Sequence, residues 1–451
     1  MASTYLTRTN GSAPTNTTKA TVSCWVKKSG LAQHQGIFGV RNTGNNNINV
    51  QCGFFNSKWY MWYKDGSTDY YLQDSATIPR DINGWYHVVF RFDTTQGAAA
   101  DRLRVYVNGE DLGNSSFSTK SNPTSNDDVI IGTNGLEWSI GRYTFTGGSH
   151  NYFDGMISHF HYCDGQSYGP DSFGSTDATT GEWKINTAPS VTYGNNGFFV
   201  LKDSNSGTDQ SGNSNNLTVG GGTLTKSEDC PSNVFAVCDN LTNINSALTF
   251  SHGNTTMTNS GQWLGALSTL AMFKGKFYWE FKCTGNFMTG VSQLNSKAVQ
   301  TDNISVANNG YSSKWAYGWE MINGGNKANN NNSSTSYGSS YSSSDIGMVA
   351  FDADVGAIWF GKNGTWQASA TQTEIENGTT TNAAWTGLTN ASGYVASFST
   401  ENSTMNLNFG NGYFGTTAVS SAGNNASGNG IFEYDVPAGF TALCTKGINS
   451  F

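Results

Sequence analysis

Charged residues are scarce in this chain. Asp, Glu, Lys and Arg make up 12% of its 451 residues, about half of the roughly 25% that is usual in globular proteins. The 24 basic and 32 acidic residues give a net charge of −8, and no cluster of Lys and Arg occurs. Because nucleic-acid binding needs a basic footprint, we expect no nucleic-acid partner.

Long apolar runs are also lacking. No run approaches the roughly 20 residues of a membrane span, so we expect no membrane insertion. The first residues, MASTYLTRTNG, lack the charged start and apolar stretch of a secretory signal. We therefore expect the chain to be made in a cytosol, or to be exported by a route that leaves no such mark.

Metal-binding cysteine pairs are absent as well. The seven cysteines include no CxxC pair, which disfavours a structural zinc site. Most of them lie in apolar, strand-like contexts (SCWV, HYCDG, EFKCTG, ALCT), so we predict small buried side chains. A bridge between Cys230 and Cys238 under oxidising conditions is the alternative.

The residues that fill the chain favour short strands and tight turns. Glycine accounts for 54 residues and aromatics for 13% of the chain. Apolar and polar residues alternate in TVSCWVKK (from Thr21), WYHVVFRFD (from Trp85) and RLRVYVNGE, which ends in the hairpin signal Asn108-Gly109. The segments DVIIGT, EWSIGRY and MISHFHYCDG continue the series at intervals of about ten residues. This pattern predicts an all-β protein built of antiparallel β-sandwiches.

A change of composition divides the chain. Residues 203–230 contain almost no large apolar side chains, so we predict two jelly-roll domains in tandem, at 1–225 and 226–451. Strand patterns resume in GKFYWEFKCTG, SDIGMVAFDADVGAIWFGKNGTW, GYVASFS and TMNLNFG. The best helix candidate, Leu264–Met272, is short enough to be interpreted as a loop or turn. The Asn- and Ser-rich stretch at 323–345 indicates a long exposed loop.

Both halves resemble known families. WYHVVFRFDTTQ followed by RLRVYVNGE resembles the laminin-G-like, concanavalin-type jelly roll over about residues 5–215. The stretch YFDGMISHFHYCDGQSYGPDSFGSTDATTGEWKI resembles laminin-G-like proteins of marine tailed bacteriophages. In the second half, GKFYWEFKCTG, TGVSQ, YGWEM, DIGMVAFDADVGAIWFGKNGTW and MNLNFGNGYF resemble a SPRY domain over about residues 245–445. The insert at 323–345 departs from the SPRY pattern near its usual binding face.

These resemblances imply a structural protein of a phage virion. Such a protein is assembled in the host cytoplasm, exposed on the particle surface, and decorates the capsid or tail or binds host-surface glycans as an adhesin, tail fibre or head fibre. Its partners are other virion proteins, host-surface carbohydrate and further copies of itself, a trimer being common for fibres. Residues 2–18 are the candidate attachment arm. The alternatives are a carbohydrate-active enzyme of the concanavalin-type fold and a SPRY-type protein-interaction module.

Catalytic residues are not evident. Concanavalin-type glycoside hydrolases need two carboxylates across the scissile bond, usually as E-x-D-x-x-E on one strand, and no such string occurs. The nearest acidic pair, Asp352 and Asp354, is interpreted as turn residues. His159 and His161, two apart on one strand, could hold a metal, but ordinary surface histidines are the favoured interpretation. We therefore predict no enzymatic activity.

No cofactor is expected, with calcium as the alternative. Asp203, Asn205, Gly207 and Asp209 alternate in a run that resembles an oxygen-ligand loop. Its glycine is out of place for the EF-hand order. A solvated linker is therefore the favoured interpretation of this run.

Aromatic residues are the most promising binding signal. In WYMWYKD, residues 59–65, alternation places one set of rings in the core and leaves the other on the surface. Exposed rings suit sugars, whose apolar C–H faces stack on them. The same surface could instead pack within the protein or against a neighbouring subunit. The candidate ligand-binding residues of the first half are Trp59, Tyr60, Trp62, Tyr63, Tyr70 and Tyr71.

The second half offers a further aromatic group. Trp315, Tyr317 and Trp319 alternate in KWAYGWE, and Tyr337 and Tyr341 lie in the Ser-rich insert. Mixtures of Tyr, Ser, Gly and Asn on loops are typical of adaptable binding surfaces. A flexible polar loop with incidental tyrosines is the alternative.

Overall fold

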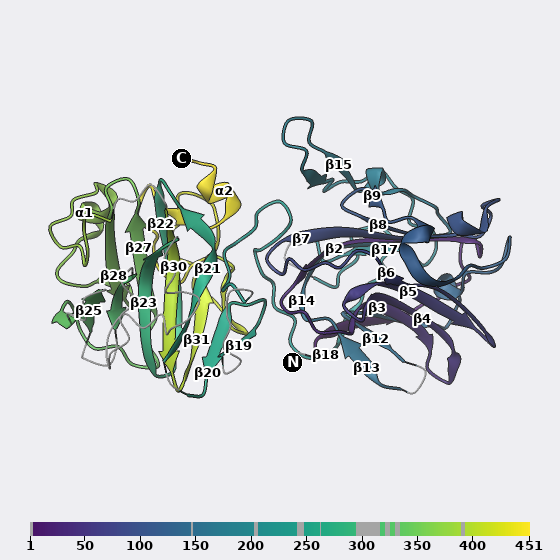
Figure 1. The fold of residues 1–451 in the computed structure, drawn as a ribbon, viewed down its shortest axis with the longest axis horizontal. Helices are drawn as coiled ribbons and strands as arrows, with labels where there is room; N and C mark the ends of the chain where they lie inside the picture. Colours follow the sequence, from purple (N-terminus) through teal and green to yellow (C-terminus); the bar gives the residue numbers. More distant parts are fainter. Residues whose placement is uncertain are drawn as a thin grey trace. The chain divides into compact units, whose positions relative to one another are not determined.

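The computed structural model describes residues 3–145, 148–202, 206–240, 248–261, 263–294, 316–320, 325–329, 334–388 and 393–451. They divide into two compact units, unit 1 (residues 1–226) and unit 2 (residues 227–451). Each unit is built almost wholly of antiparallel strands (Figure 1), which confirms the predicted fold class. In these described ranges no helix is long and apolar enough to cross a membrane.

Unit 1 is a sandwich of two sheets, which we call sheet A and sheet B. The strands of sheet A in spatial order are β10 (Phe117–Ser121), β6 (Thr68–Ser75), β5 (Lys58–Asp65), β4 (Asn45–Phe55), β3 (Gln35–Asn42), β11 (Glu137–Ile140), β1 (Tyr5–Thr9) and β18 (Thr218–Gly221), with β13 (His150–Tyr152) joining β3 to β12 (Arg142–Thr144). The strands of sheet B are β17 (Phe198–Val200), β14 (Gly155–Asp164), β2 (Lys19–Lys28), β7 (Trp85–Asp93), β8 (Leu103–Val107) and β9 (Glu110–Asp111).

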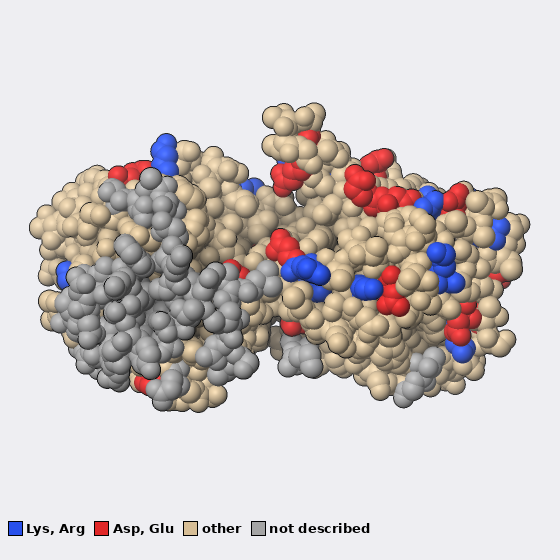
Figure 2. Space-filling model, viewed as in Figure 1, with Lys and Arg blue, Asp and Glu red and all other residues tan. Residues whose placement is uncertain are grey.

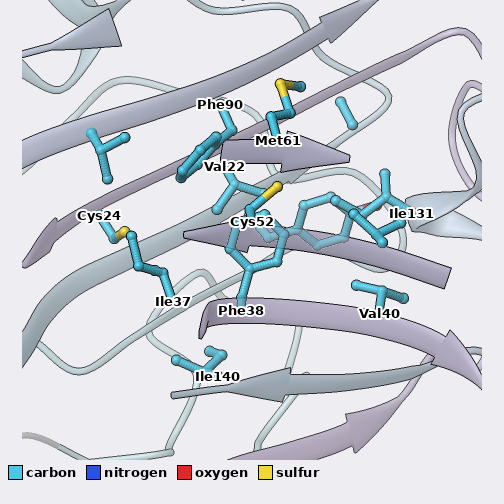
Figure 3. Packing of buried hydrophobic residues seen from close by; sticks show 14 of the residues in the cluster. Val22, Cys24, Ile37, Phe38, Val40, Cys52, Met61, Phe90, Ile131 and Ile140 are labelled. Carbon is cyan, nitrogen blue, oxygen red and sulfur yellow. The ribbon is translucent and has the colours of Figure 1, made fainter. Parts of the chain in front are cut away.

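The core of unit 1 lies between sheets A and B. Alternate residues of each strand point into it, as the period of two predicts. Figure 3 shows Val22 and Cys24 of β2 near Phe38 of β3 and Cys52 of β4, all fully buried. The predicted Asn108-Gly109 turn is confirmed, because both residues have positive φ (48° and 84°) between β8 and β9.

One expectation for unit 1 was wrong. DVIIGT is not a strand: Ile130–Gly132 form one buried 3₁₀ turn, in which the Thr133 amide donates to the Ile130 carbonyl. Within the candidate attachment arm, strand β1 pairs with β11 on one side and β18 on the other, so residues 5–9 belong to sheet A.

A segment that we call the strap, residues 165–197, covers the outer face of sheet B. It carries a two-stranded sheet, sheet C, which is the hairpin of β15 (Gly174–Thr176) and β16 (Trp183–Ile185). Its Phe173 packs with Val89 and Cys163 of the sheet, joined by Tyr168, Val191 and Tyr193. Sheet B is therefore buried on both faces at this place.

Two histidines of sheet B lie beneath the strap. The Trp183 indole N–H donates to His87 Nδ1 (3.0 Å), and His87 Nε2 lies 2.8 Å from the Ser23 hydroxyl. His161 is 2% exposed, and its Nδ1 lies 2.9 Å from the Tyr193 hydroxyl. The expectation of a surface histidine was thus wrong for His161, because sequence alternation does not reveal a third layer.

Unit 2 is also a sandwich, of sheets D and E. Sheet D contains β19 (Leu248–Ser251), β20 (Thr256–Asn259), β31 (Ser403–Asn408), β22 (Lys276–Cys283), β27 (Gly347–Asp352), β28 (Ala357–Lys362) and β29 (Thr365–Trp366), with β34 (Thr441–Ala442) also paired to β22. Sheet E contains β21 (Leu264–Met272), β30 (Tyr394–Glu401), β23 (Asn286–Gln293), β24 (Ala316–Glu320), β25 (Asn326–Asn329) and β26 (Ser334–Ser336). Outside them lie β32 (Tyr413–Phe414), β33 (Thr417–Ala418), α1 (Gln372–Glu376) and α2 (Thr445–Ile448).

Sheet D is likewise covered on both faces. Every residue of β27 is buried, with Val349 and Phe351 in the cluster between the sheets and Met348 and Ala350 in a second cluster. The C-terminal stretch joins this second layer through Glu280 of β22. The Glu280 carboxylate accepts the backbone N–H groups of Glu433 and Tyr434 at 2.8 and 2.9 Å.

Unit 2 corrects two further expectations. Leu264–Met272 is strand β21, paired to β30 with a register shift, and not a loop or turn. The stretch at 323–345 is not simply an exposed loop, because β25 and β26 add two strands to sheet E. A second two-residue turn joins β28 to β29 at Asn363-Gly364, with φ values of 50° and 78°.

The buried His87 predicts acid sensitivity of unit 1. Burial lowers the pKa of His87 from 6.5 to about 3, whereas an unfolded chain binds that proton below about 6.5. The stabilisation is therefore complete above pH 6.5 and is lost as the pH falls towards 3, by about 1.4 kcal/mol per pH unit. Hydrogen exchange of β2 and β7 peptides in the full chain measures this slope.

A His87→Phe variant should reduce the change in the free energy of unfolding per pH unit. It also removes the hydrogen bond from Trp183, which holds the strap on sheet B. The exposed His150 provides the comparison. Partial burial also lowers its pKa, so His150→Gln should change the slope, but by less than His87→Phe does. An identical slope in the wild-type and His87→Phe chains would contradict the assignment.

Candidate ligand-binding site

A hollow of about 360 Å³ opens on the outer face of sheet A. Its floor comes from three adjacent strands, β4, β5 and β6. Their register pairs Gln51 with Trp62 and Trp62 with Tyr71, so these side chains form one row across the outer face. The residues that line the hollow are Gln51, Phe55, Tyr60, Trp62, Asp69, Tyr71, Gln73, Thr119 and Phe145.

Alternation along β5 decides which rings reach this hollow. Trp59, Met61 and Tyr63 are fully buried in the core, so Tyr60 and Trp62 point to the opposite face. Tyr60 lies opposite Gly53 of β4. A Cβ at Gly53 would lie 2.3 Å from the Gln35 carbonyl oxygen, so the position excludes any side chain.

Aromatic contacts hold the wall of the hollow in place. The Phe55 and Tyr60 ring centroids are 5.3 Å apart, and those of Tyr143 and Phe145 are 5.5 Å apart. His34 packs on Phe55 from behind, with ring centroids 4.5 Å apart. Such contacts fix side-chain rotamers before any ligand arrives, which reduces the entropy cost of binding.

Polar groups of the hollow are oriented by the same scaffold. Gln51, 2% exposed, donates its amide to the Thr144 carbonyl (3.1 Å) and accepts from the Tyr60 hydroxyl (3.4 Å). Burial raises the pKa of Tyr60 well above its ordinary value, so this hydroxyl stays protonated. The amide and hydroxyl are therefore fixed hydrogen-bonding groups at neutral pH.

The charge of the hollow comes from Asp69. Lys64 of β5 lies directly opposite Asp69 of β6, and its ammonium is 3.8 Å from Asp69 Oδ2. Asp69 Oδ1 is shielded from solvent and has no hydrogen-bond partner in the structure. Among the described lining residues Asp69 is the one acid, and neither Lys nor Arg occurs.

The structure sorts the six predicted aromatic residues of unit 1. Tyr60, Trp62 and Tyr71 line the hollow. Trp59 and Tyr63 belong to the core, where no ring face is open to a ligand, so placing them in a binding site was wrong. Tyr70 points the same way, with its ring 5.0 Å from that of Tyr63 and its hydroxyl bonded to Asp127.

The predicted residues of unit 2 do not form a surface site. Trp319 is fully buried, and Tyr317 packs on Trp385 with ring centroids 5.9 Å apart. Tyr337 and Tyr341 are buried, and their hydroxyls donate to the Asn382 and Asp345 carbonyls. The two tyrosine rings can therefore belong to the core, because their hydroxyls have acceptors inside the protein. Trp315 lies outside the described residues.

Six lining residues were missed by sequence reasoning. Gln51 and Phe55 follow the alternation of β4, and Asp69 and Gln73 that of β6, so the period of two could have found them once the register was known. Thr119 and Phe145 arrive from remote segments, and no local pattern marks them.

The other chemical candidates have structural partners. Asp352 Oδ1 accepts the N–H groups of Asp354 and Val355, and its carboxylate lies 3.3 Å from the Lys276 ammonium, which confirms the interpretation as turn residues. The Asp209 carboxylate accepts four donors from Phe199, Ser211 and Asn215, while Asp203 and Asn205 lie outside the described residues.

Histidines and cysteines add no metal site to the described part of the chain. His159 occupies a bulge with φ of 47°, and no group of three potential ligands was found among the described residues. All seven cysteines are free thiols, so the Cys230–Cys238 alternative was wrong. All but Cys230 are buried, as predicted.

The comparisons with known proteins agree with this fold for unit 1. Residues 1–166 match the Laminin_G_3 family, described as the concanavalin A-like lectin/glucanases superfamily. Unit 1 is similar to these lectins and glucanases. The match covers sheet A as far as β13 and sheet B as far as β14, and therefore includes every residue that lines the hollow. No curated protein matches the chain.

Solved structures give more distant likenesses. The TRIM65 PSpry domain is 14% identical, with 38% of this chain and 91% of that one covered and a TM-score of 0.28. The SPRY domain of human HERC1 is 16% identical, with 36% and 92% covered and a TM-score of 0.27. Domain 4 of AbnA, an arabinanase from Geobacillus stearothermophilus in complex with arabinotriose, is 20% identical, with 35% and 65% covered and a TM-score of 0.26. Likenesses at this level carry no conclusion about this chain.

The alternation of β5 predicts opposite effects for two neighbouring tryptophans. Trp59→Ala should cost about 3–5 kcal/mol of stability, because it empties a core site. Trp62→Ala should cost less than about 1 kcal/mol, because the ring is partly exposed in the hollow. Thermal unfolding of the full chain measures both. A loss for Trp62→Ala as large as that for Trp59→Ala would place Trp62 in the core and contradict the site.

Proposed function

We propose that unit 1 is a lectin-like module that binds glycans in the hollow on sheet A. The observation that carries this proposal is the convergence of five aromatic rings, two glutamine amides, a hydroxyl and a carboxylate on one space of about 360 Å³. Sugar rings stack their C–H faces on aromatic side chains, while amides and carboxylates bind their hydroxyl groups. The volume lies at the small end of ligand sites and suits one or two sugar rings.

We further propose that the module holds its ligand without cleaving it. A glycoside hydrolase places two carboxylates about 5–10 Å apart across the scissile bond. Among the described residues that line the hollow, Asp69 alone has a carboxylate. This arrangement supports binding, and release of reducing sugar from a bound polysaccharide would contradict it.

We also propose a place for the protein on the surface of a tailed-phage particle. What supports this role is the resemblance of the stretch from Tyr152 to laminin-G-like proteins of marine phages, together with the SPRY-like segments of the second half. In this role the chain is assembled in the host cytoplasm and decorates the capsid or tail. Its partners are other virion proteins, further copies of itself, with a trimer as one form, and host-surface carbohydrate.

Removal of the stacking rings should weaken glycan binding. Each aromatic contact contributes about 0.5–1.5 kcal/mol, so Trp62→Ala and Tyr71→Ala should each lower affinity about 2- to 10-fold. A glycan array read with the labelled full chain identifies ligands, and calorimetry measures the loss. Phe273 of unit 2, 60% exposed, is the matched control, and Phe273→Ala should bind like wild type. Equal affinity of all three variants and wild type would contradict the site.

Antibody labelling tests the place on the particle. Gold-labelled antibodies against the chain should decorate the capsid or tail of intact phage from a producing host. Free protein added to host cells should also slow adsorption if the chain is the adhesin. Particles that carry none of this chain would overturn the virion role while leaving the glycan site intact.

A further inference from the structure

The charges around the hollow distinguish one class of glycan from another. Uronic acids and sialic acids carry carboxylates, whose binding is favoured by a cation at the site. The described lining residues provide one carboxylate, that of Asp69, and five aromatic rings, but neither Lys nor Arg. Bringing an anionic sugar here would place like charges together in a partly desolvated space, which is unfavourable.

We propose that the hollow binds an amine-bearing sugar, whose ammonium group pairs with Asp69; this inference rests on the proposed glycan-binding function. Aromatic faces attract cations through the ring quadrupole, and this attraction grows when water is excluded. The hollow therefore has two independent features that favour positive charge: the carboxylate of Asp69 and the rings of Trp62 and Tyr71 beside it.

The carboxylate of Asp69 is not saturated by hydrogen bonds within the protein. Asp69 Oδ1 has no partner in the structure, although it is shielded from solvent, and a shielded acceptor without a donor is costly. Asp69 Oδ2 is 3.8 Å from the Lys64 ammonium, which is beyond hydrogen-bond distance. Partly exposed pairs of this kind contribute little, so a ligand ammonium competes with Lys64 at small cost.

The fixed amide of Gln51 and the cross-strand row orient the sugar. Gln51, Trp62 and Tyr71 lie side by side on three strands, and Lys64 and Asp69 form the next pair on the same face of β5 and β6. A ring stacked on Trp62 or Tyr71 thus has the carboxylate of Asp69 as a near neighbour. The charge of that carboxylate favours an ammonium substituent over a neutral hydroxyl at this place.

Matched oligosaccharides test the proposal directly. Oligomers of β1,4-linked glucosamine and of N-acetylglucosamine share a backbone and differ in the charged amine. At a pH that keeps the amine protonated, the full chain should bind the glucosamine oligomer about tenfold more tightly, and added salt should reduce this preference. Asp69→Asn should remove most of the preference, whereas Asp65→Asn, at the exposed end of β5, should retain it.

Two further variants separate charge from stacking. Lys64→Gln frees Asp69 from its neighbour and should strengthen glucosamine binding. Trp62→Ala should weaken binding of both oligomers, and that of the glucosamine oligomer more, because the ring also attracts the ammonium. Equal affinity for the two oligomers in wild type, unchanged by Asp69→Asn, would overturn the amine preference while Trp62-dependent binding of any glycan keeps the proposed function. Absence of binding to both oligomers and to every glycan on an array would overturn both.

Discussion

The pleat of β5 is the constraint on which the site depends. Trp59, Met61 and Tyr63 fill the core between sheets A and B, and this burial fixes the register of the strand. A shift of one residue would exchange the two faces and expose three large side chains to water. The core therefore determines where Tyr60 and Trp62 lie, and the hollow is a consequence of packing on the opposite side of the same strand.

Sequence alternation predicted that β5 has a core face and a surface face, but it could not assign every residue of the core or of the hollow. The period of two separates Trp59 and Tyr63 from Trp62, yet it does not state which set is inside. Phe145 and Thr119 reach the hollow from segments far along the chain, and only the folded register brings them to Trp62 and Tyr71. The all-β class and the two Asn-Gly turns were predictable because their causes are local: strand period and positive φ.

Additional layers explain most of the wrong expectations. The strap covers the outer face of sheet B, and a second apolar cluster covers the outer face of sheet D. Residues such as His161 looked like surface residues because a two-layer sandwich would expose them. Figure 2 shows how thinly charges are spread over the face in view, so composition gave little help in separating covered from open surface. Tyr337 and Tyr341 were also expected at the surface. They can be buried because their hydroxyls donate to backbone carbonyls inside unit 2.

The hydrogen bond from Trp183 to His87 has a chemical consequence for Ser23. An indole nitrogen only donates, so His87 Nδ1 must be the lone-pair nitrogen and the ring proton must sit on Nε2. That proton points at the Ser23 oxygen, which receives it as an acceptor. A serine hydrolase needs the opposite polarity, with a basic nitrogen that removes the hydroxyl proton. The pair has the spacing of a nucleophile and its base, but the tryptophan locks it in the tautomer that leaves the serine unactivated.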